Sequence, residues 1–89
     1  MTAPKFTFTG LVLVSATNEP GVEEKVLAVL EPFTIEINEI QRIALRGRLI
    51  IGILIGFDPV HAPAIEADIN AFSENSGIDA AFDYSSEAI

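Results

Sequence analysis

The stretch Asn18-Glu19-Pro20-Gly21-Val22 joins two segments with different hydrophobic periodicities. Ahead of it, residues Phe6 to Val14 alternate as in a β-strand, and after it apolar side chains recur at helical spacing from Val22 to Phe33. A Pro-Gly pair before a helix makes a tight turn, and the first backbone N–H groups of that helix have no partner within it. Such a turn can hold an anion such as a carboxylate. In the alternative interpretation the turn is structural only, and Asn18 serves as an N-cap or Asx-turn residue.

Two further strands follow the first predicted helix. Branched side chains return from Thr34 to Leu45, and their uneven spacing predicts a β-bulge near Asn38-Glu39. Arg46-Gly47 is short enough for a tight hairpin, and the apolar run from Arg48 to Phe57 predicts the next strand. We therefore expect the second and third strands to be antiparallel neighbours.

A second helix and a last strand complete the pattern. Pro63 suits the first turn of a helix that ends at Ser76-Gly77, and the alternation from Ile78 to Tyr84 predicts a strand. The order β-α-β-β-α-β predicts an α+β, ferredoxin-like fold: a four-stranded antiparallel sheet with both helices on one face. We expect residues 1–89 to form this single domain.

Charge and composition exclude several classes of partner. Five Lys and Arg against thirteen Asp and Glu give a net charge of −8, which argues against nucleic acid and anionic membranes. The absence of cysteine excludes disulfides and thiolate metal sites. The longest apolar run, Leu49 to Phe57, is too short to cross a bilayer as a helix. The residues from Met1 to Lys5 lack the features of a signal peptide, so we expect a cytoplasmic protein.

No group of side chains predicts catalysis, a metal site or a cofactor. His61 is the only histidine, and without a nearby partner ligand it is a poor metal ligand or general base. The carboxylates of the second predicted helix scatter around it, which is typical of a solvated surface. Three arginines gather near the predicted hairpin, where we expect them to be solvated or to pair with acids of a neighbouring copy or domain: Arg42, Arg46 and Arg48.

The predicted sheet carries apolar side chains on both faces. One face of such a sheet should lie under the helices and the other in water. Yet Leu11 and Leu13 of the first strand, with Ile50 and Leu54 of the third, fall on the second face. Large apolar surfaces are usually covered, so we expect self-association or docking to another domain. The alternative is a set of scattered surface aliphatic residues.

Three features of the chain resemble the ACT domain, an amino-acid-sensing regulatory module of βαββαβ order. They are the first strand, Asn18-x-Pro20-Gly21-Val22 at the start of the first helix, and Glu36-Ile37-x-x-Ile40 on the second strand. The resemblance covers nearly all of the chain. More narrowly, residues Ile37 to Leu49 and the run Ile51-Gly52-Ile53-Leu54-Ile55 are similar to the N-terminal ACT region of multidomain phosphoserine phosphatases of L-serine biosynthesis.

This resemblance implies a site, a ligand and partners. ACT domains pair side by side or interlock, and small amino acids bind at the seam between the first turn of one copy and the second strand of the next. The implied ligand-facing residues are Thr17, Asn18, Glu19, Gly21 and Val22 in the turn, with Glu36 and Asn38 from the second strand. The implied ligand is L-serine or glycine. The implied partners are a second copy or a second ACT domain, and a catalytic phosphatase domain in a larger parent protein.

Two positions depart from the ACT pattern. Many members have Asp at the position of Asn18, and members that bind serine well often have Asn or Asp at the position of Glu36. Asn keeps a hydrogen-bond acceptor but lacks the charge, so ammonium binding should weaken. An ACT module that only holds subunits together is therefore the alternative function. The chain also lacks the Asp-x-Asp triplet that such a phosphatase needs, so we expect no enzyme activity from these residues alone.

Overall fold

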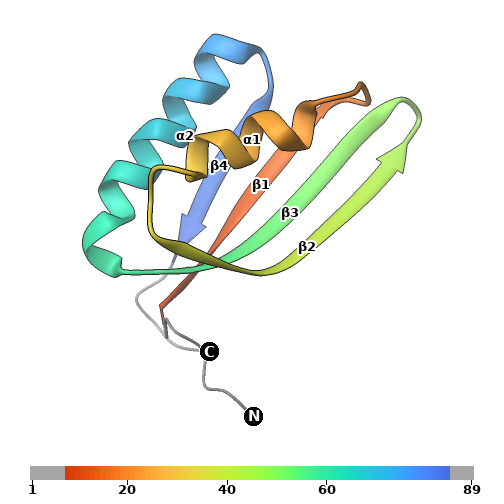
Figure 1. Cartoon of the computed structure of the whole chain (residues 1–89). Helices are drawn as coiled ribbons and strands as arrows, with labels where there is room; N and C mark the ends of the chain where they lie inside the picture. Colours follow the sequence, from red (N-terminus) through yellow and green to blue (C-terminus); the bar gives the residue numbers. More distant parts are fainter. Residues whose placement is uncertain (1–7, 85–89) are drawn as a thin grey trace.

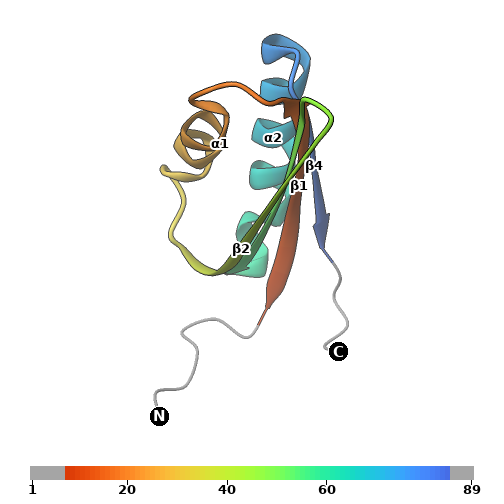
Figure 2. The same cartoon turned by 90° about the vertical axis from the view of Figure 1, so that its right-hand side faces the viewer.

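Four strands and two helices follow one another in the order βαββαβ in the computed structural model, which describes residues 8–84 (Figure 1). The elements are β1 (Thr9–Thr17), α1 (Val22–Leu30), β2 (Ile35–Leu45), β3 (Arg48–Phe57), a 3-10 turn (Pro59–His61), α2 (Ala62–Ser76) and β4 (Asp79–Tyr84). The strands form one antiparallel sheet in the order β2-β3-β1-β4. Both helices lie on the same face of that sheet (Figure 2). The predicted ferredoxin-like fold is confirmed.

The largest differences from the predicted element boundaries are in β1 and α1. β1 begins at Thr9 and continues to Thr17, because it pairs with β3 as far as Thr17 opposite Arg48; Phe6 lies outside the described residues. α1 ends at Leu30 and does not reach Phe33. Glu31 still donates to the Leu27 carbonyl, but Pro32 has no N–H group to continue the helical hydrogen bonds, so the helix stops there.

The hairpin between β2 and β3 is confirmed in detail. Its two turn residues both have positive φ, 49° at Arg46 and 79° at Gly47, as a two-residue turn between twisted strands requires. The pairing of β2 with β3 shifts register between Ile37 and Glu39, so the predicted bulge is present at Asn38. β2 is the longest strand and lies at an edge of the sheet.

The core lies between the sheet and the helices. Its fully buried members come from β1, β3 and both helices: Val12, Val14, Val22, Val26, Leu30, Ile51, Ile53, Ile55, Phe57, Ile65 and Ile69. At one end Phe57 packs against Phe82, with ring centroids 5.3 Å apart, and against the edge of Phe8 at 5.2 Å. The backbone of Gly10 passes directly beneath these rings, where a Cβ atom would lie 2.6 Å from Phe82 Cε1.

The face of the sheet away from the helices is apolar, as its sequence predicts. No segment within residues 8–84 covers this open face (Figure 2). Leu13 of β1 and Ile50 of β3 are 44% and 40% exposed there. The expected covering partner remains a prediction.

Candidate ligand-binding site

The turn between β1 and α1 is held in place by the β2–β3 hairpin. Thr17 ends β1 and Val22 begins α1, so residues 18–21 form the connection. The backbone N–H of Asn18 donates to the carbonyl of Gly47 at 2.9 Å. This bond places the turn at the hairpin end of the sheet, as Figure 1 shows.

Gly21 is the N-cap residue of α1. Its φ of 89° lies in the left-handed region that favours glycine, and it caps the helix without a side-chain hydrogen bond. The interpretation of Asn18 as the N-cap is therefore wrong, because the extra turn through Pro20 and Gly21 places the helix start three residues later. Among the described residues, no hydrogen bond of the Asn18 side chain is found.

The start of α1 presents donors and negative charge together. Its first internal hydrogen bond runs from the Lys25 N–H to the Gly21 carbonyl at 3.1 Å, so the N–H groups of Val22, Glu23 and Glu24 have no partner within the helix. The helix dipole adds partial positive charge at this end. The carboxylate of Glu24 folds back over the turn, with Oε2 3.9 Å from where a Cβ on Gly21 would lie. The free N–H groups can therefore bind an anion here, and the Glu24 carboxylate can bind a cation.

An ion pair between Arg42 and Glu23 connects β2 to the start of α1. Arg42 reaches Glu23 with two hydrogen bonds, one from Nε to Oε1 and one from Nη2 to Oε2 at 2.8 Å. These hydrogen bonds lower the pKa of Glu23; partial burial acts in the opposite direction, and the charge of Arg42 makes a smaller contribution that also lowers it. The hydrogen bond to Glu23 and the carboxylate charge raise the pKa of Arg42. Arg42 is solvent-exposed as expected, but it pairs with an acid of its own chain, because its strand position faces α1.

A groove runs along the same edge of the molecule, between α1 and the first half of β2. It encloses about 470 Å³ and is mainly apolar, with one carboxylate at each end; its lining is Glu24, Leu27, Ala28, Leu30, Glu31, Phe33, Ile35 and Ile37. Ile37 is 45% exposed because no strand lies beyond β2. Sequence reasoning missed this groove, although the helical spacing of Leu27 and Glu31 on α1 was a usable signal. What it lacked was the edge position of β2.

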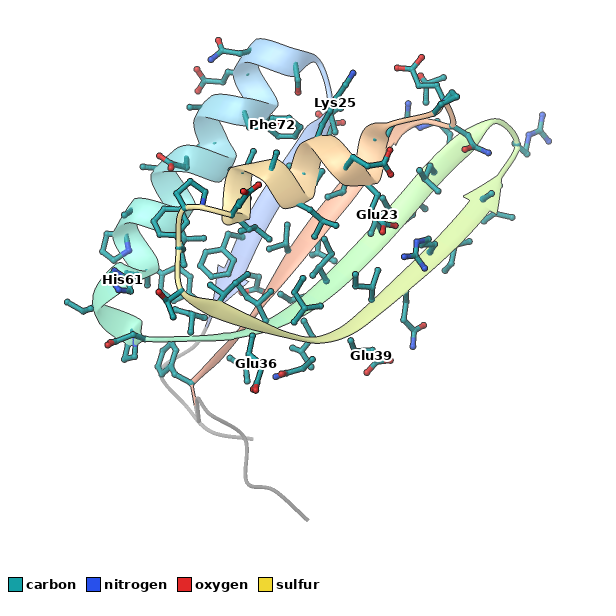
Figure 3. All side chains as sticks on the ribbon, in the orientation of Figure 1. Glu23, Lys25, Glu36, Glu39, His61 and Phe72 are labelled. Carbon is teal, nitrogen blue, oxygen red and sulfur yellow. The ribbon has the colours of Figure 1, made fainter. Side chains whose placement is uncertain are left out.

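The two predicted residues on β2 lie far from the turn within one chain. Glu36 pairs with Gly56 and Asn38 is the bulged residue, both in the first half of β2, whereas the turn contacts the hairpin at its other end. Figure 3 shows Glu36 at the opposite end of the sheet from the start of α1. Ile35 and Ile37 face the helices, so strand alternation turns Glu36 to the open face. One copy thus brings together Thr17, Asn18, Glu19, Gly21 and Val22, without Glu36 or Asn38.

The remaining polar residues do not form a second centre. Across residues 8–84, no three histidine, aspartate or glutamate side chains gather closely enough to hold a metal ion. His61 lies in the 3-10 turn with its ring 6.4 Å from that of Phe33. In this same part of the chain, neither helix has the length and apolar character needed to cross a membrane.

Comparison with known proteins gives consistent matches. A family model described as ACT domain matches residues 10–83. Phosphoserine phosphatase SerB2 of Mycobacterium tuberculosis is 28% identical over an alignment of 79 residues, which covers 86% of this chain and 19% of that protein. The chain thus spans about a fifth of the length of this relative.

Solved structures share the fold at low sequence identity. A formyltetrahydrofolate deformylase from Pseudomonas putida KT2440 matches with a TM-score of 0.74 and 17% identity, over 89% of this chain and 30% of that one. The regulatory subunit of aspartate kinase from Thermus thermophilus, in its ligand-free form, matches with a TM-score of 0.65 and 15% identity, over 88% and 51%. At such identities these likenesses concern the fold alone.

Proposed function

This chain belongs to the ACT domain family, and on that premise we propose that it binds a small amino acid at the β1–α1 turn and regulates a larger protein. ACT domains are regulatory modules, and members of the family bind amino acids. The observation that carries the proposal is the start of α1, where three free N–H groups adjoin the Glu24 carboxylate. A zwitterionic amino acid needs donors for its carboxylate and acceptors for its ammonium group.

The geometry of the turn supports a small ligand. Gly21 has no side chain above the free N–H groups, so the carboxylate of an amino acid can approach the backbone closely. The Asn18 amide oxygen and the Glu24 carboxylate can accept from its ammonium group. Glu24 thereby supplies the charge that Asn18 lacks relative to Asp. Glu23 is less available for this role because Arg42 already engages both of its oxygens.

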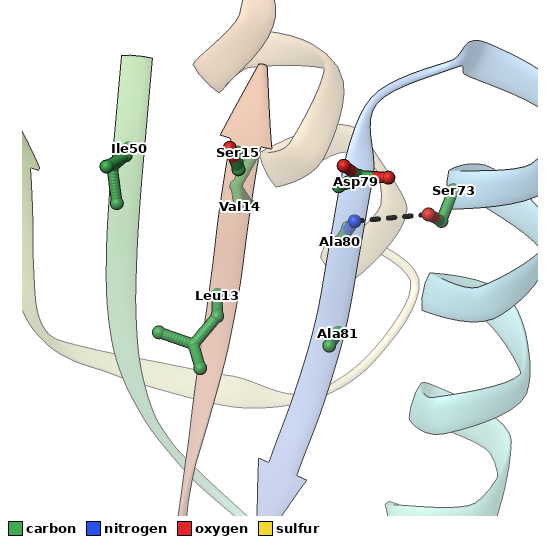
Figure 4. A pocket seen from close by; sticks show the side chains of 8 residues that line it. All are labelled: Leu13, Val14, Ser15, Ile50, Ser73, Asp79, Ala80 and Ala81. Carbon is green, nitrogen blue, oxygen red and sulfur yellow. Dashed lines mark hydrogen bonds between the residues drawn. The ribbon is translucent and has the colours of Figure 1, made fainter. Parts of the chain in front are cut away.

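The two edges of the sheet differ in how open they are. β4 has six residues, and the N–H of Ala80 already donates to Ser73 Oγ at 3.1 Å (Figure 4). β2 has eleven residues and lies beside the apolar groove. We therefore place the seam with a second copy at β2. Antiparallel pairing about a two-fold axis would bring Glu36 and Asn38 of one copy beside the hairpin half of the other, where the turn lies.

The proposed parent protein is a phosphoserine phosphatase, and the proposed ligand is L-serine, with glycine as the second candidate. The match to phosphoserine phosphatase SerB2 supports this assignment, since serine is the product of that chemistry. A ligand that bridges two copies favours the arrangement that forms the seam. It can shift a distant active site only by the difference in its affinity for the two arrangements.

Calorimetric titration with L-serine, with glycine in parallel, tests the proposal. Gly21→Gln should abolish binding, because its side chain covers the free N–H groups. Gly77→Gln is the matched control: Gly77 also has a positive φ, 77°, but caps the far end of α2. Gly77→Gln should lose a similar amount of stability through backbone strain but still bind the amino acid. No heat at about millimolar ligand, near the weak end of specific binding, would remove the sensor function.

The alternative function is an ACT module that only assembles subunits. The observation that favours it is Asn18, whose side chain brings no charge to the turn. Such a module would pair through β2 yet give no heat with either amino acid. Sedimentation of the same sample in the same buffer separates the two functions.

A further inference from the structure

The open face of the sheet has an apolar centre on its two middle strands. Leu11 and Leu13 of β1 lie beside Leu54 and Gly52 of β3, and Ile50 follows toward the hairpin. Leu13 and Ile50 are 44% and 40% exposed. This surface lies opposite the helices and away from the β1–α1 turn, so it is separate from the turn part of the proposed amino-acid site (Figure 2).

Two shallow hollows adjoin Leu13 on this face. One encloses about 280 Å³, and its lining is Leu11, Leu13, Glu39, Gln41, Gly52 and Leu54. It exists because Gly52 leaves a gap between Gln41 and Leu13 in the same cross-strand row. The other encloses about 290 Å³ where Ala81 of β4 is too short to fill the space beside Leu13 (Figure 4). The centre of the face can therefore receive apolar side chains.

Carboxylates border this apolar centre on both edge strands. One cross-strand row reads Glu39, Leu54, Leu11 and Asp83 from β2 to β4, so two leucines lie between two acids. Asp79 lies on the same face of β4, opposite Ser15. Arg48 lies at the hairpin end of this face, where it donates to Ser15 Oγ at 2.9 Å. Within the described residues, neither Glu39, Asp79 nor Asp83 forms an ion pair.

We propose that the open face docks an amphipathic α-helix of a partner protein, with its apolar stripe on β1 and β3 and lysine or arginine side chains along both flanks. Strands are about 4.8 Å apart, so the acidic edge strands are separated by about 14 Å across three spacings. An α-helix with its side chains is about 10–12 Å wide and fits between them. Lysine and arginine stems can then lie over the leucines while their charges reach Glu39, Asp79 and Asp83.

Charge argues against a second copy as the occupant. Each chain carries a net charge of −8, and face-to-face pairing would bring the acidic borders of two copies together. A basic helix instead neutralises those borders and covers the apolar centre. Docking there leaves the β1–α1 turn and the β2 edge accessible, so it goes beyond the proposed amino-acid function and does not depend on it.

The first experiment uses a defined probe: an acetylated and amidated 18-residue peptide with leucines at helical i, i+3, i+4 and i+7 spacing and lysines on both sides of that stripe. Amide NMR shifts of the labelled chain should change on β1, β3 and β4 at Leu11, Leu13, Gly52 and Ala81. The same peptide with glutamate in place of lysine should not bind. Shift changes confined to α2, or no binding by the lysine peptide, would overturn the proposal.

Matched variants separate docking from general attraction to an acidic protein. The triple change Glu39→Gln, Asp79→Asn, Asp83→Asn should weaken peptide binding by about tenfold, since each exposed ion pair contributes modestly. The control, Glu66→Gln, Asp68→Asn, Glu74→Gln, removes the same charge from α2. It should weaken binding less than about threefold. Equal losses in the two triple variants would show non-specific attraction and refute the site.

A second pair of variants tests the apolar centre. Gly52→Val should fill the hollow and block the peptide, and its Cβ meets only Leu11 Cδ1, at 3.9 Å. If that variant does not fold, Leu13→Ser takes its place, with Val60→Ser, at a position 73% exposed in the 3-10 turn, as the control. Full peptide binding by both Leu13→Ser and Gly52→Val would overturn the proposal. So would a wild-type dimer that Leu13→Ser converts to monomer, because a second copy would then occupy the face.

Discussion

At the scale of single residues, Gly10 and Gly52 show that the two faces of the sheet differ in the space they leave for an added Cβ atom. A Cβ on Gly10 would lie 2.6 Å from Phe82 Cε1 and 2.9 Å from Phe57 Cε1. Those rings pack against each other and cannot withdraw easily. We expect Gly10→Ala to lower the free energy of unfolding by about 1–3 kcal/mol. Gly52→Ala, on the neighbouring strand, should change it by less than about 0.5 kcal/mol. Urea unfolding measures both, and equal effects would contradict the packing.

The Arg42–Glu23 pair should make part of the stability depend on pH. The pKa of Glu23 is lower in the folded chain than its ordinary value of 4.5. Stability from this pair is therefore present above that value and is lost as the pH falls through the folded pKa. Arg42→Gln should lower the melting temperature at about pH 7 and have much less effect at about pH 2. Lys25→Gln serves as control, because it removes one positive charge from α1 and Lys25 forms no ion pair within residues 8–84. A difference that persists unchanged in acid would contradict this assignment.

Single residues also mark the limit of sequence reasoning. The rings that lie above Gly10 of β1 come from β3 and β4, which lie far along the chain. The Arg42–Glu23 ion pair is a second example. Their contact spans nineteen positions and depends on how α1 crosses β2. Local periodicity contains no information of that kind.

At the scale of elements, the β2–β3 hairpin carries a correctable strain. Arg46 has a φ of 49° and is the only residue other than glycine with positive φ in the described part of the chain. Asn tolerates this conformation better than Arg, and Asn-Gly is the favoured pair for such a turn. We expect Arg46→Asn to raise the free energy of unfolding by about 0.5–1 kcal/mol. Gly47→Ala should lower it, because φ there is 79°. Thermal unfolding of the three proteins compares them, and a less stable Arg46→Asn would contradict the turn assignment.

Most elements could be predicted because their signals are local. The bounds of β3, the two-residue hairpin and the bulge at Asn38 follow from alternation, Gly47 and uneven branched-residue spacing. The end of α1 was misplaced because the apolar stripe continues past Pro32, and Phe33 still packs against the core without being helical. The turn between β1 and α1 was predicted for the same local reason, because Pro20-Gly21 lies where strand periodicity gives way to helical periodicity. The groove was not predicted, because it forms only where α1 lies beside β2.

At the scale of the whole molecule, the order of strands decides which surfaces are free. The sequence predicts four strands but does not state that β2 lies at an edge beside α1. That position exposes Ile37, opens the groove and separates Glu36 from the turn within one chain. The seam-based site therefore requires a second copy, whereas the helix-docking surface does not. The two proposals therefore differ in the oligomeric state that they require.

The last prediction concerns that oligomeric state. Ile37→Lys puts a charge on the open edge of β2, a change that disfavours pairing of edge strands. If two copies join at β2, it should convert the wild-type dimer to monomer in sedimentation velocity runs. Leu13→Lys is matched in exposure, 44% against 45%, but lies on a central strand and should leave the dimer intact. If Leu13→Lys abolishes the dimer and Ile37→Lys does not, the second copy lies on the open face. That result would contradict the β2 seam and the docked helix together, because one surface cannot hold both a second copy and a basic helix.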